Sequence, residues 1–203
     1  MRVYVVDDDP LIRRMVTRML AGETAECQAF ETAAAFLDAL DTLPFGCVLL
    51  DVHMPDHNGL EVLQEVLLRR PFPVIMASGS TDMDDAITSF RRGAVHFLRK
   101  PFDRRTLMTT LAEAETIGLR HKAAAERREL ASQIRLTPRE QQVLEATAAG
   151  QQSKSIAWRL GLSVRTVEMH RSHFLTKLGA ANASQAVAIA RTLGLMPEME
   201  IAA

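Results

Sequence analysis

The chain has 203 residues, enough for two modest domains or one large one, and its 47% hydrophobic and 24% charged residues are typical of a globular protein rather than a disordered one. No stretch approaches the roughly 18 consecutive apolar residues of a membrane span, and the acid-rich start MRVYVVDDDP is unlike a secretory signal peptide, so we expect a cytoplasmic protein that does not enter the membrane. The net charge of −1 hides an asymmetry, because residues 1–120 carry 13 Lys and Arg against 18 Asp and Glu, whereas residues 121–203 carry 11 against 7.

Short apolar runs alternate with helical segments in the first half of the chain. Nearly continuous apolar runs predict buried strands at 2–6, 24–30, 46–50, 72–78 and 95–99. Helices are predicted after the capping residue Asp9, from about Asp103, and over 32–40, 59–69 and 82–92. Strands that alternate with helices predict a five-stranded parallel sheet covered on both faces, an α/β doubly wound fold of the flavodoxin-like kind.

The pattern changes near residue 120, after which only helices are predicted. The segment RHKAAAERRELASQ is rich in Ala, Arg and Glu, which predicts a solvated helical connector that could continue the preceding helix. Thr137, Pro138 and Glu140 form a capping-box pattern for a helix that ends near Gly150. Three more helices are predicted, one from Ser153 as its cap to residue 160, then 164–178 and 182–193. The second half is therefore expected to be a small all-α domain.

Five polar residues follow the predicted strands at the points where they end. Because the carboxyl ends of parallel strands share one edge of a sheet, we expect these side chains on a single rim: Asp7, Asp8, Asp51, Ser78 and Lys100. Clustered carboxylates repel one another unless they bind a cation, and oxygen ligands suit Mg²⁺. A carboxylate can also accept a phosphoryl group covalently. The rim therefore predicts metal-assisted phosphoryl chemistry at Asp51.

The first 115 residues resemble the receiver domain of bacterial two-component response regulators. The resemblance is carried by VVDDDP, LLDVHMPDHNGLEVL, ASG and GAVHFLRKPF, in order and at suitable spacings. By that resemblance, Asp51 is the phosphoryl acceptor, and Mg²⁺ is bound by Asp7, Asp8, Asp51 and the backbone carbonyl of His53.

The same resemblance implies how the site signals. Ser78, in place of the more common threonine, and Lys100 contact the phosphoryl oxygens, and the Lys100–Pro101 bond is expected to be cis. Phe97 holds the position of an aromatic switch that turns inward when Ser78 moves toward the phosphate. We expect the imidazole of His53 to be incidental, since only its backbone is used.

A helix, a tight turn at Gly161 and a longer helix make a helix-turn-helix pattern in the second half. The segment LTPREQQVLEATAAGQQSKSIAWRLGLSVRTVEMHRSHFLTKLGA resembles the LuxR-type DNA-binding domain. By that resemblance the second helix lies in the major groove, and the closing helix pairs two domains. Trp158 is expected to pack against the domain rather than lie near the DNA backbone. The expected DNA contacts are Lys154, Arg165, Thr166, Glu168, Met169, His170, Arg171 and Ser172.

The two resemblances together imply a response regulator of the FixJ/NarL family, with a receiver at 1–116, a helical linker at 117–135 and a DNA-binding domain at 136–203. Its partners would be a sensor histidine kinase, double-stranded DNA, a second copy of the chain and RNA polymerase. It would catalyse nothing beyond its own phosphorylation and dephosphorylation.

Three alternatives stay open at this point. A receiver that acts independently of phosphorylation would keep the fold, and a phosphate sink would lack DNA binding. A phosphatase of the haloacid-dehalogenase type is disfavoured, because such enzymes keep an Asp two residues after the nucleophile, where this chain has His53.

Overall fold

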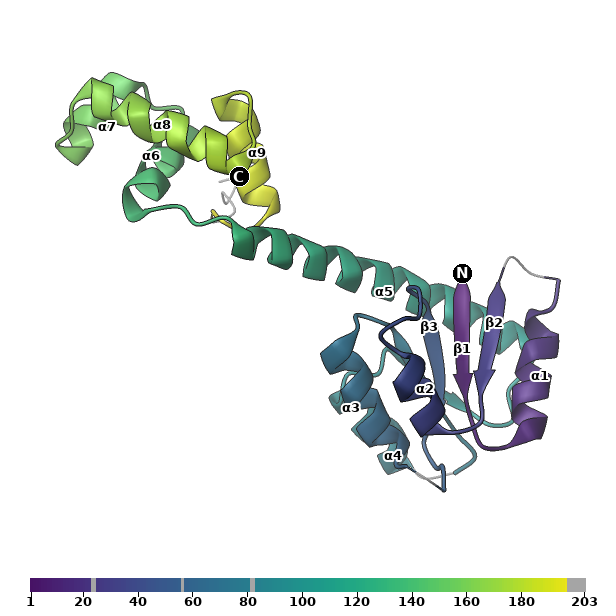
Figure 1. Ribbon diagram of the computed structural model, residues 1–203. Helices are drawn as coiled ribbons and strands as arrows, with labels where there is room; N and C mark the ends of the chain where they lie inside the picture. The colour runs from purple at the N-terminus through teal and green to yellow at the C-terminus, as the bar shows by residue number, and fades with distance from the viewer. Residues whose placement is uncertain (23–24, 56, 81–82, 197–203) are drawn as a thin grey trace. The chain divides into compact units, whose positions relative to one another are not determined.

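The computed structural model describes residues 1–22, 25–55, 57–80 and 83–196 (Figure 1). The contacts within the chain divide it into two units, Met1–Ala123 and Ala124–Ala203. Within the described residues, no helix is both long enough and apolar enough to cross a bilayer.

A parallel sheet forms the centre of the first unit. Its strands are β1 (Arg2–Val6), β2 (Glu26–Phe30), β3 (Cys47–Asp51), β4 (Val74–Ser78) and β5 (His96–Arg99), in the order β2-β1-β3-β4-β5. The predicted doubly wound sheet is confirmed. β4 begins two residues later than predicted, because Pro73 has no amide hydrogen for the ladder and contributes only its carbonyl, which accepts from the Val48 amide.

Helices cover both faces of this sheet. They are α1 (Pro10–Leu20), α2 (Ala33–Ala39), α3 (Gly59–Arg69), α4 (Met83–Arg91) and α5 (Arg104–Gln133). Successive strand residues point to opposite faces, so Tyr4 and Val6 pack under α2 and α3 while Val3 and Val5 pack under α1 and α5.

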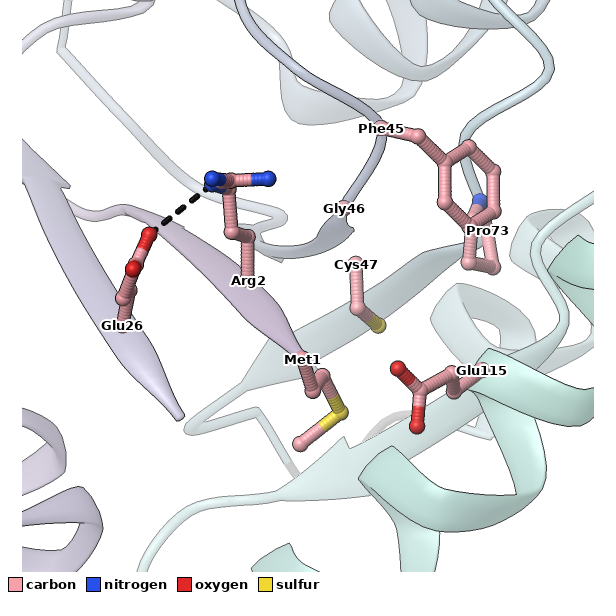
Figure 2. A pocket seen from close by; sticks show the side chains of 8 residues that line it. All are labelled: Met1, Arg2, Glu26, Phe45, Gly46, Cys47, Pro73 and Glu115. Carbon is pink, nitrogen blue, oxygen red and sulfur yellow. Dashed lines mark hydrogen bonds and ion pairs between the residues drawn. The ribbon is translucent and has the colours of Figure 1, made fainter. Parts of the chain in front are cut away.

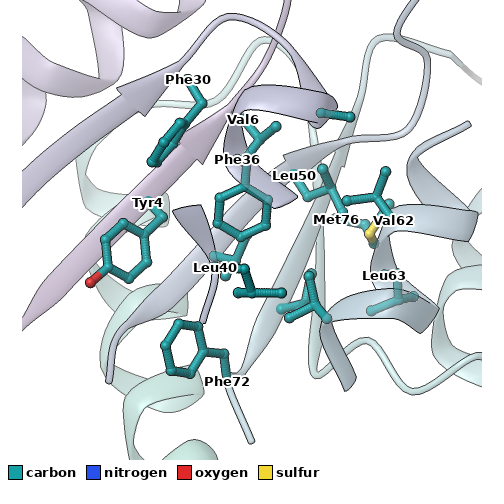
Figure 3. Close-up of a cluster of buried hydrophobic side chains, with 14 of the residues drawn as sticks. Tyr4, Val6, Phe30, Phe36, Leu40, Leu50, Val62, Leu63, Phe72 and Met76 are labelled. Atoms are coloured by element: carbon teal, nitrogen blue, oxygen red, sulfur yellow. The ribbon is translucent and has the colours of Figure 1, made fainter. Parts of the chain in front are cut away.

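The layer under α2 and α3 is rich in aromatic rings (Figure 3). Tyr4 stacks on Phe72 with ring centroids 5.9 Å apart, and its hydroxyl donates to the Pro44 carbonyl at 2.7 Å. The polar end of a buried ring is therefore satisfied. This core packs against β1 and β3, and both strands end at the predicted acidic rim.

The second unit is helical in its described part, as predicted. After the end of α5 come α6 (Pro138–Ala148), α7 (Ser153–Leu160), α8 (Val164–Leu178) and α9 (Ala183–Thr192) around a separate apolar core. The capping box of Thr137 and Glu140 is present in both directions.

The predicted cap of α7 is wrong. The cap is Gln152, without a side-chain hydrogen bond, because the Ser153 hydroxyl is engaged by Glu168 and Arg171 of α8 instead. Gly161 ends α7 at a φ of 65°, a left-handed conformation that glycine adopts without the Cβ penalty.

Candidate functional site

The ends of β1 and β3 bring the three predicted carboxylates together. These two strands are neighbours in the sheet, which places Asp7 and Asp8 beside Asp51. Their ligand atoms all lie within 4.8 Å of one another; Asp7 and Asp51 are buried and Asp8 is exposed. Such an arrangement of hard oxygen ligands, open to solvent on one side, suits a divalent cation such as Mg²⁺.

Lys100, from the end of β5, joins this cluster. Its Nζ lies 2.6 Å from Asp7 Oδ2 and 3.1 Å from Asp51 Oδ1. Its amide donates to the Ser78 carbonyl at 2.8 Å, and its bond to Pro101 is cis, as expected. The Lys100 side chain therefore extends from the edge strand β5 to the buried acids Asp7 and Asp51.

The electrostatics of the cluster follow from its burial. Burial raises the pKa of Asp51 above its ordinary value; the Lys100 charge opposes this and the Asp7 charge adds to it. The pKa of Lys100 is also raised, since its bonds to Asp7 and Asp51 outweigh the lowering effect of burial. Two cations lie beside the three acids, Lys100 and Arg13, whose Nη1 donates to the Asp7 and Asp8 carbonyls at 2.7 and 2.8 Å; the acids still outnumber them, so the site favours an additional cation.

The start of α3 lies close to the backbone of β3. Asn58 caps the helix by accepting from the Leu60 amide at 2.9 Å. A Cβ built on Gly59 would lie 2.0 Å from the Asp51 carbonyl oxygen, so only glycine fits there. The glycine that ends LLDVHMPDHNG is therefore required by the close approach of the α3 backbone to the β3 backbone. Asp56 lies outside the described residues.

Ser78 and His53 both bond to a residue that the sequence did not single out. The buried Ser78 hydroxyl accepts from the Ser80 amide at 3.0 Å and donates to Asp85 Oδ2 at 3.4 Å. His53 Nε2 lies 2.9 Å from the same oxygen of Asp85, in the first turn of α4. The imidazole is therefore a partner of Asp85, not incidental as expected, and no local motif marks Asp85.

Phe97 is half-buried and packs against the aromatic-rich core beneath α2 and α3. It stands next to Met76 of β4 in the strand register. Its position one strand away from Ser78 is compatible with the predicted switch.

A separate cavity of about 290 Å³ lies at the opposite edge of the sheet (Figure 2). It is lined at the amino ends of the strands, where Arg2 pairs with Glu26 at 2.9 Å and Cys47 faces Glu115. Because the predicted acids lie at the carboxyl ends, this cavity is distinct from their site.

The predicted DNA contacts gather on α8 and the start of α7. Ser163 caps α8, and its hydroxyl accepts from the Thr166 amide at 3.0 Å. Thr166, His170 and Arg171 are half-buried. The exposed members of the set are Lys154, Arg165, Glu168, Met169 and Ser172.

Two of these contacts are already held by other side chains. Ser153 donates to Glu168 and accepts from Arg171 Nη1 at 2.9 Å. This bridge links the start of α7 to the middle of α8 and gives both charged side chains a partner within the domain.

The expectation for Trp158 is wrong. Its side chain is 88% exposed on α7, because four residues of helix carry it to the same solvent-facing side as Lys154. An isolated exposed tryptophan is a common feature of contact surfaces. Periodicity could not decide this, since a short helix with two buried residues leaves most of its circumference open.

Comparison with known proteins assigns each half of the chain to a family. Residues 3–112 match the response regulator receiver domain, and residues 135–190 match the LuxR family of bacterial regulatory proteins. The transcriptional regulatory protein FixJ of Bradyrhizobium diazoefficiens is 37% identical over 96% of each chain, and TdiR of Thauera aromatica is 35% identical over 87% of this chain and 79% of its own.

Solved structures agree as well. Full-length FixJ from B. japonicum matches 97% of this chain and 98% of its own with a TM-score of 0.60 at 35% identity. The response regulator StyR matches 94% and 98% with a TM-score of 0.75 at 29% identity.

Proposed function

The chain belongs to the two-component response regulators with a LuxR-type DNA-binding domain. We propose that phosphorylation of Asp51 controls its affinity for DNA. The proposed parts are a receiver at 1–116, a helical linker at 117–135 and a DNA-binding domain at 136–203. The protein would act in the cytoplasm, and a sensor histidine kinase would supply the phosphoryl group.

Phosphorylation proceeds by attack of an Asp51 carboxylate oxygen on the phosphorus of a phosphohistidine. An O–P bond forms at Asp51 as the P–N bond breaks, and the imidazole leaving group takes up a proton. Lys100, 3.1 Å from Asp51, moves to balance the charge that arrives on the phosphoryl oxygens. The single observation that carries this proposal is the convergence of three acids and one lysine on two buried strand ends.

A magnesium ion would be held by Asp7, Asp8, Asp51 and the carbonyl of His53. When bound, it supplies positive charge to the phosphoryl oxygens. The fit is supported by the excess of acids over cations and by the ligand atoms of Asp7, Asp8 and Asp51, which lie within 4.8 Å of one another. Beyond assisting its own phosphorylation and hydrolysis in this way, the protein has no proposed catalytic activity.

The phosphorylated receiver favours a homodimer through α4. Met83, Ile87 and Phe90 are 72%, 45% and 51% exposed and recur at helical spacing, which makes one apolar stripe. Ser78 and Phe97 couple the phosphoryl group to this face. A dimer then makes the second DNA contact intramolecular, which raises the effective concentration of the second domain.

The DNA-binding unit inserts α8 into the major groove. Met169 and Glu168 face bases, while Lys154 and Arg165 contact phosphates. The helix end capped by Ser163 adds its amides to the phosphate contacts. RNA polymerase is the expected further partner on the promoter.

Phosphorylation is tested with acetyl phosphate and Mg²⁺ on a phosphate-affinity gel. The wild type shifts, whereas Asp51→Asn does not; Asp38→Asn, the same change on the exposed face of α2, shifts like the wild type. Beryllofluoride should then tighten DNA binding only where Asp51 is present. If phosphorylated and unphosphorylated protein bind DNA equally, the alternative of a phosphorylation-independent receiver holds.

The DNA surface is tested by the salt dependence of binding to promoter DNA. Removal of one phosphate contact in Arg165→Ala should reduce the slope of log K against log salt by about 0.9. Arg139→Ala, on α6 and bonded to Gln142, should leave the slope unchanged. Equal slopes in the two variants contradict the assignment of Arg165.

A further inference from the structure

Asp85 is the meeting point of two groups from the candidate phosphorylation site. Its Oδ2 lies 2.9 Å from His53 Nε2 and 3.4 Å from the Ser78 hydroxyl. His53 comes from the loop after the acceptor strand, and Ser78 ends the next strand of the sheet. The Asp85 side chain is 19% exposed and the His53 side chain 63%, so the contact with Ser78 is the more sheltered of the two. The Asp85 carboxylate therefore connects α4 with both His53 and Ser78, which lie near Asp51.

We propose that Asp85 is a positioning residue that holds Ser78, His53 and α4 in the unphosphorylated arrangement, and that phosphorylation of Asp51 releases it. The inference deepens the proposed function and rests on it. Asp85 acts through Ser78 and His53 and does not touch the reacting atoms.

Competition for one proton is the physical basis of the release. A serine hydroxyl has a single hydrogen to donate. Ser78 gives it to Asp85, while the Ser80 amide occupies one of its lone pairs. A phosphoryl group on Asp51 requires the same hydrogen, and it offers three acceptor oxygens and a charge of about −1.5 to −2, against a single negative charge on the Asp85 carboxylate. The contact at 3.4 Å is long, so it is readily exchanged for a better one.

The imidazole contact gives Asp85 its second anchor. At 2.9 Å it is the shorter of the two, and it ties α4 to the loop whose backbone lies beside the acceptor. The His53 amide also bonds to the Asp51 carboxylate, so a shift of that carboxylate reaches Asp85 through a single residue. Both routes from Asp51 to α4 therefore end at the same carboxylate.

Release of Asp85 would change the surface that is proposed to dimerise. Its own carbonyl accepts from the buried Ser89 hydroxyl at 2.6 Å, so its backbone is anchored in the body of α4. The exposed stripe of Met83, Ile87 and Phe90 lies on the same helix. Asp85 thus biases a two-state element, with the contacts made in one state and lost in the other.

The test is the dimer dissociation constant of the full chain by sedimentation, measured without phosphoryl donor. Asp85→Ala should dimerise about threefold to tenfold more tightly than the wild type, the range expected for one or two partly sheltered hydrogen bonds. The same gain should appear in an Asp51→Asn background, where no phosphorylation is possible. Asp84→Ala removes an adjacent acid from the same helical turn and should change the constant by less than twofold.

Two further variants separate positioning from mere structure. Asp85→Asn keeps an oxygen acceptor and should lie between wild type and Asp85→Ala. His53→Ala should mimic Asp85→Ala in part, and the double variant should add less than the two single effects combined. A purely structural role would instead lower the unfolding temperature without tightening the dimer.

The outcomes distinguish this inference from the proposed function. If Asp85→Ala and Asp85→Asn dimerise like the wild type, while beryllofluoride with Mg²⁺ still tightens the wild-type dimer, the role of Asp85 is wrong and the proposed function survives. If beryllofluoride leaves the wild type unchanged, the proposed function itself fails.

Discussion

Replacement of Lys100 by methionine gives the sharpest test of the charge balance at the sheet edge. The lysine contacts Asp7 at 2.6 Å and Asp51 at 3.1 Å, and its side chain is 13% exposed. Methionine keeps much of the volume but leaves two buried carboxylates without a cation. Breaking one side of a buried pair typically costs about 3–5 kcal/mol, because a charge is left uncompensated.

Protonation sets an upper limit to this cost. A carboxyl group with an unfolded pKa of about 3.9 takes up a proton at pH 7 for roughly 4 kcal/mol, and at pH 5 for about 1.5 kcal/mol. The variant should therefore lose about 3–4 kcal/mol at pH 7 and at most about 1.5 kcal/mol at pH 5. The sign follows because the folded variant binds more protons than its unfolded chain, so its stability falls as pH rises through this window.

Urea unfolding in the presence of a chelator measures the effect. Tyr4 is the sole tyrosine and is buried in the receiver core, so near-ultraviolet circular dichroism of the tyrosine band reports this unit. Magnesium ions should restore part of the lost stability, since they replace the missing charge. If Lys100→Met is as stable as the wild type at pH 7 without metal, or if its loss is the same at pH 5, Lys100 does not balance these acids.

Three other predictions concern the close backbone approach, the DNA-binding core and the exposed tryptophan. Gly59→Ala would bring a Cβ to 2.0 Å from the Asp51 carbonyl oxygen, so it should cost about 1–3 kcal/mol in urea unfolding and slow phosphorylation. Gly79→Ala is the control and should cost less, because among the described residues no atom beyond its chain neighbours lies within 4 Å of its Cβ. Glu140→Gln should destabilise the DNA-binding unit by about 1–3 kcal/mol at pH 7, because the buried carboxylate accepts from a lysine at 2.6 Å and from the cap of α6. Burial raises the pKa of Glu140, but these hydrogen bonds outweigh it and hold the pKa below the ordinary value. Its contribution is therefore present above the unfolded pKa and lost as pH falls toward the folded one, so the two proteins should converge in acid unfolding. Trp158 is the sole tryptophan and is 88% exposed on α7, the first helix of the motif, which we expect to cross the DNA backbone; its fluorescence should therefore change on addition of promoter DNA, and an unchanged spectrum on saturation contradicts that placement.

Local patterns were sufficient for most of the fold. Continuous apolar runs identified the five strands, since buried parallel strands need no polar side. The acids and Lys100 could be assigned to one edge because parallel strands all end on the same side. The capping box of Thr137 and Glu140 could also be predicted from the sequence, because both of its hydrogen bonds lie within four residues.

Contacts between residues distant in sequence were decided only by the tertiary structure. Asp85 meets His53 across 32 residues, and Ser153 leaves its expected cap for Glu168, 15 residues away. Trp158 is exposed although its type favours burial. In each case the side chain had a choice of partners, water included, and the packing of separate elements set which was within reach. The amino-acid order determines the strands and the charges at their ends, because these depend on neighbours along the chain. The contact of α4 with the candidate phosphorylation site depends on where folded elements meet, which no short segment encodes.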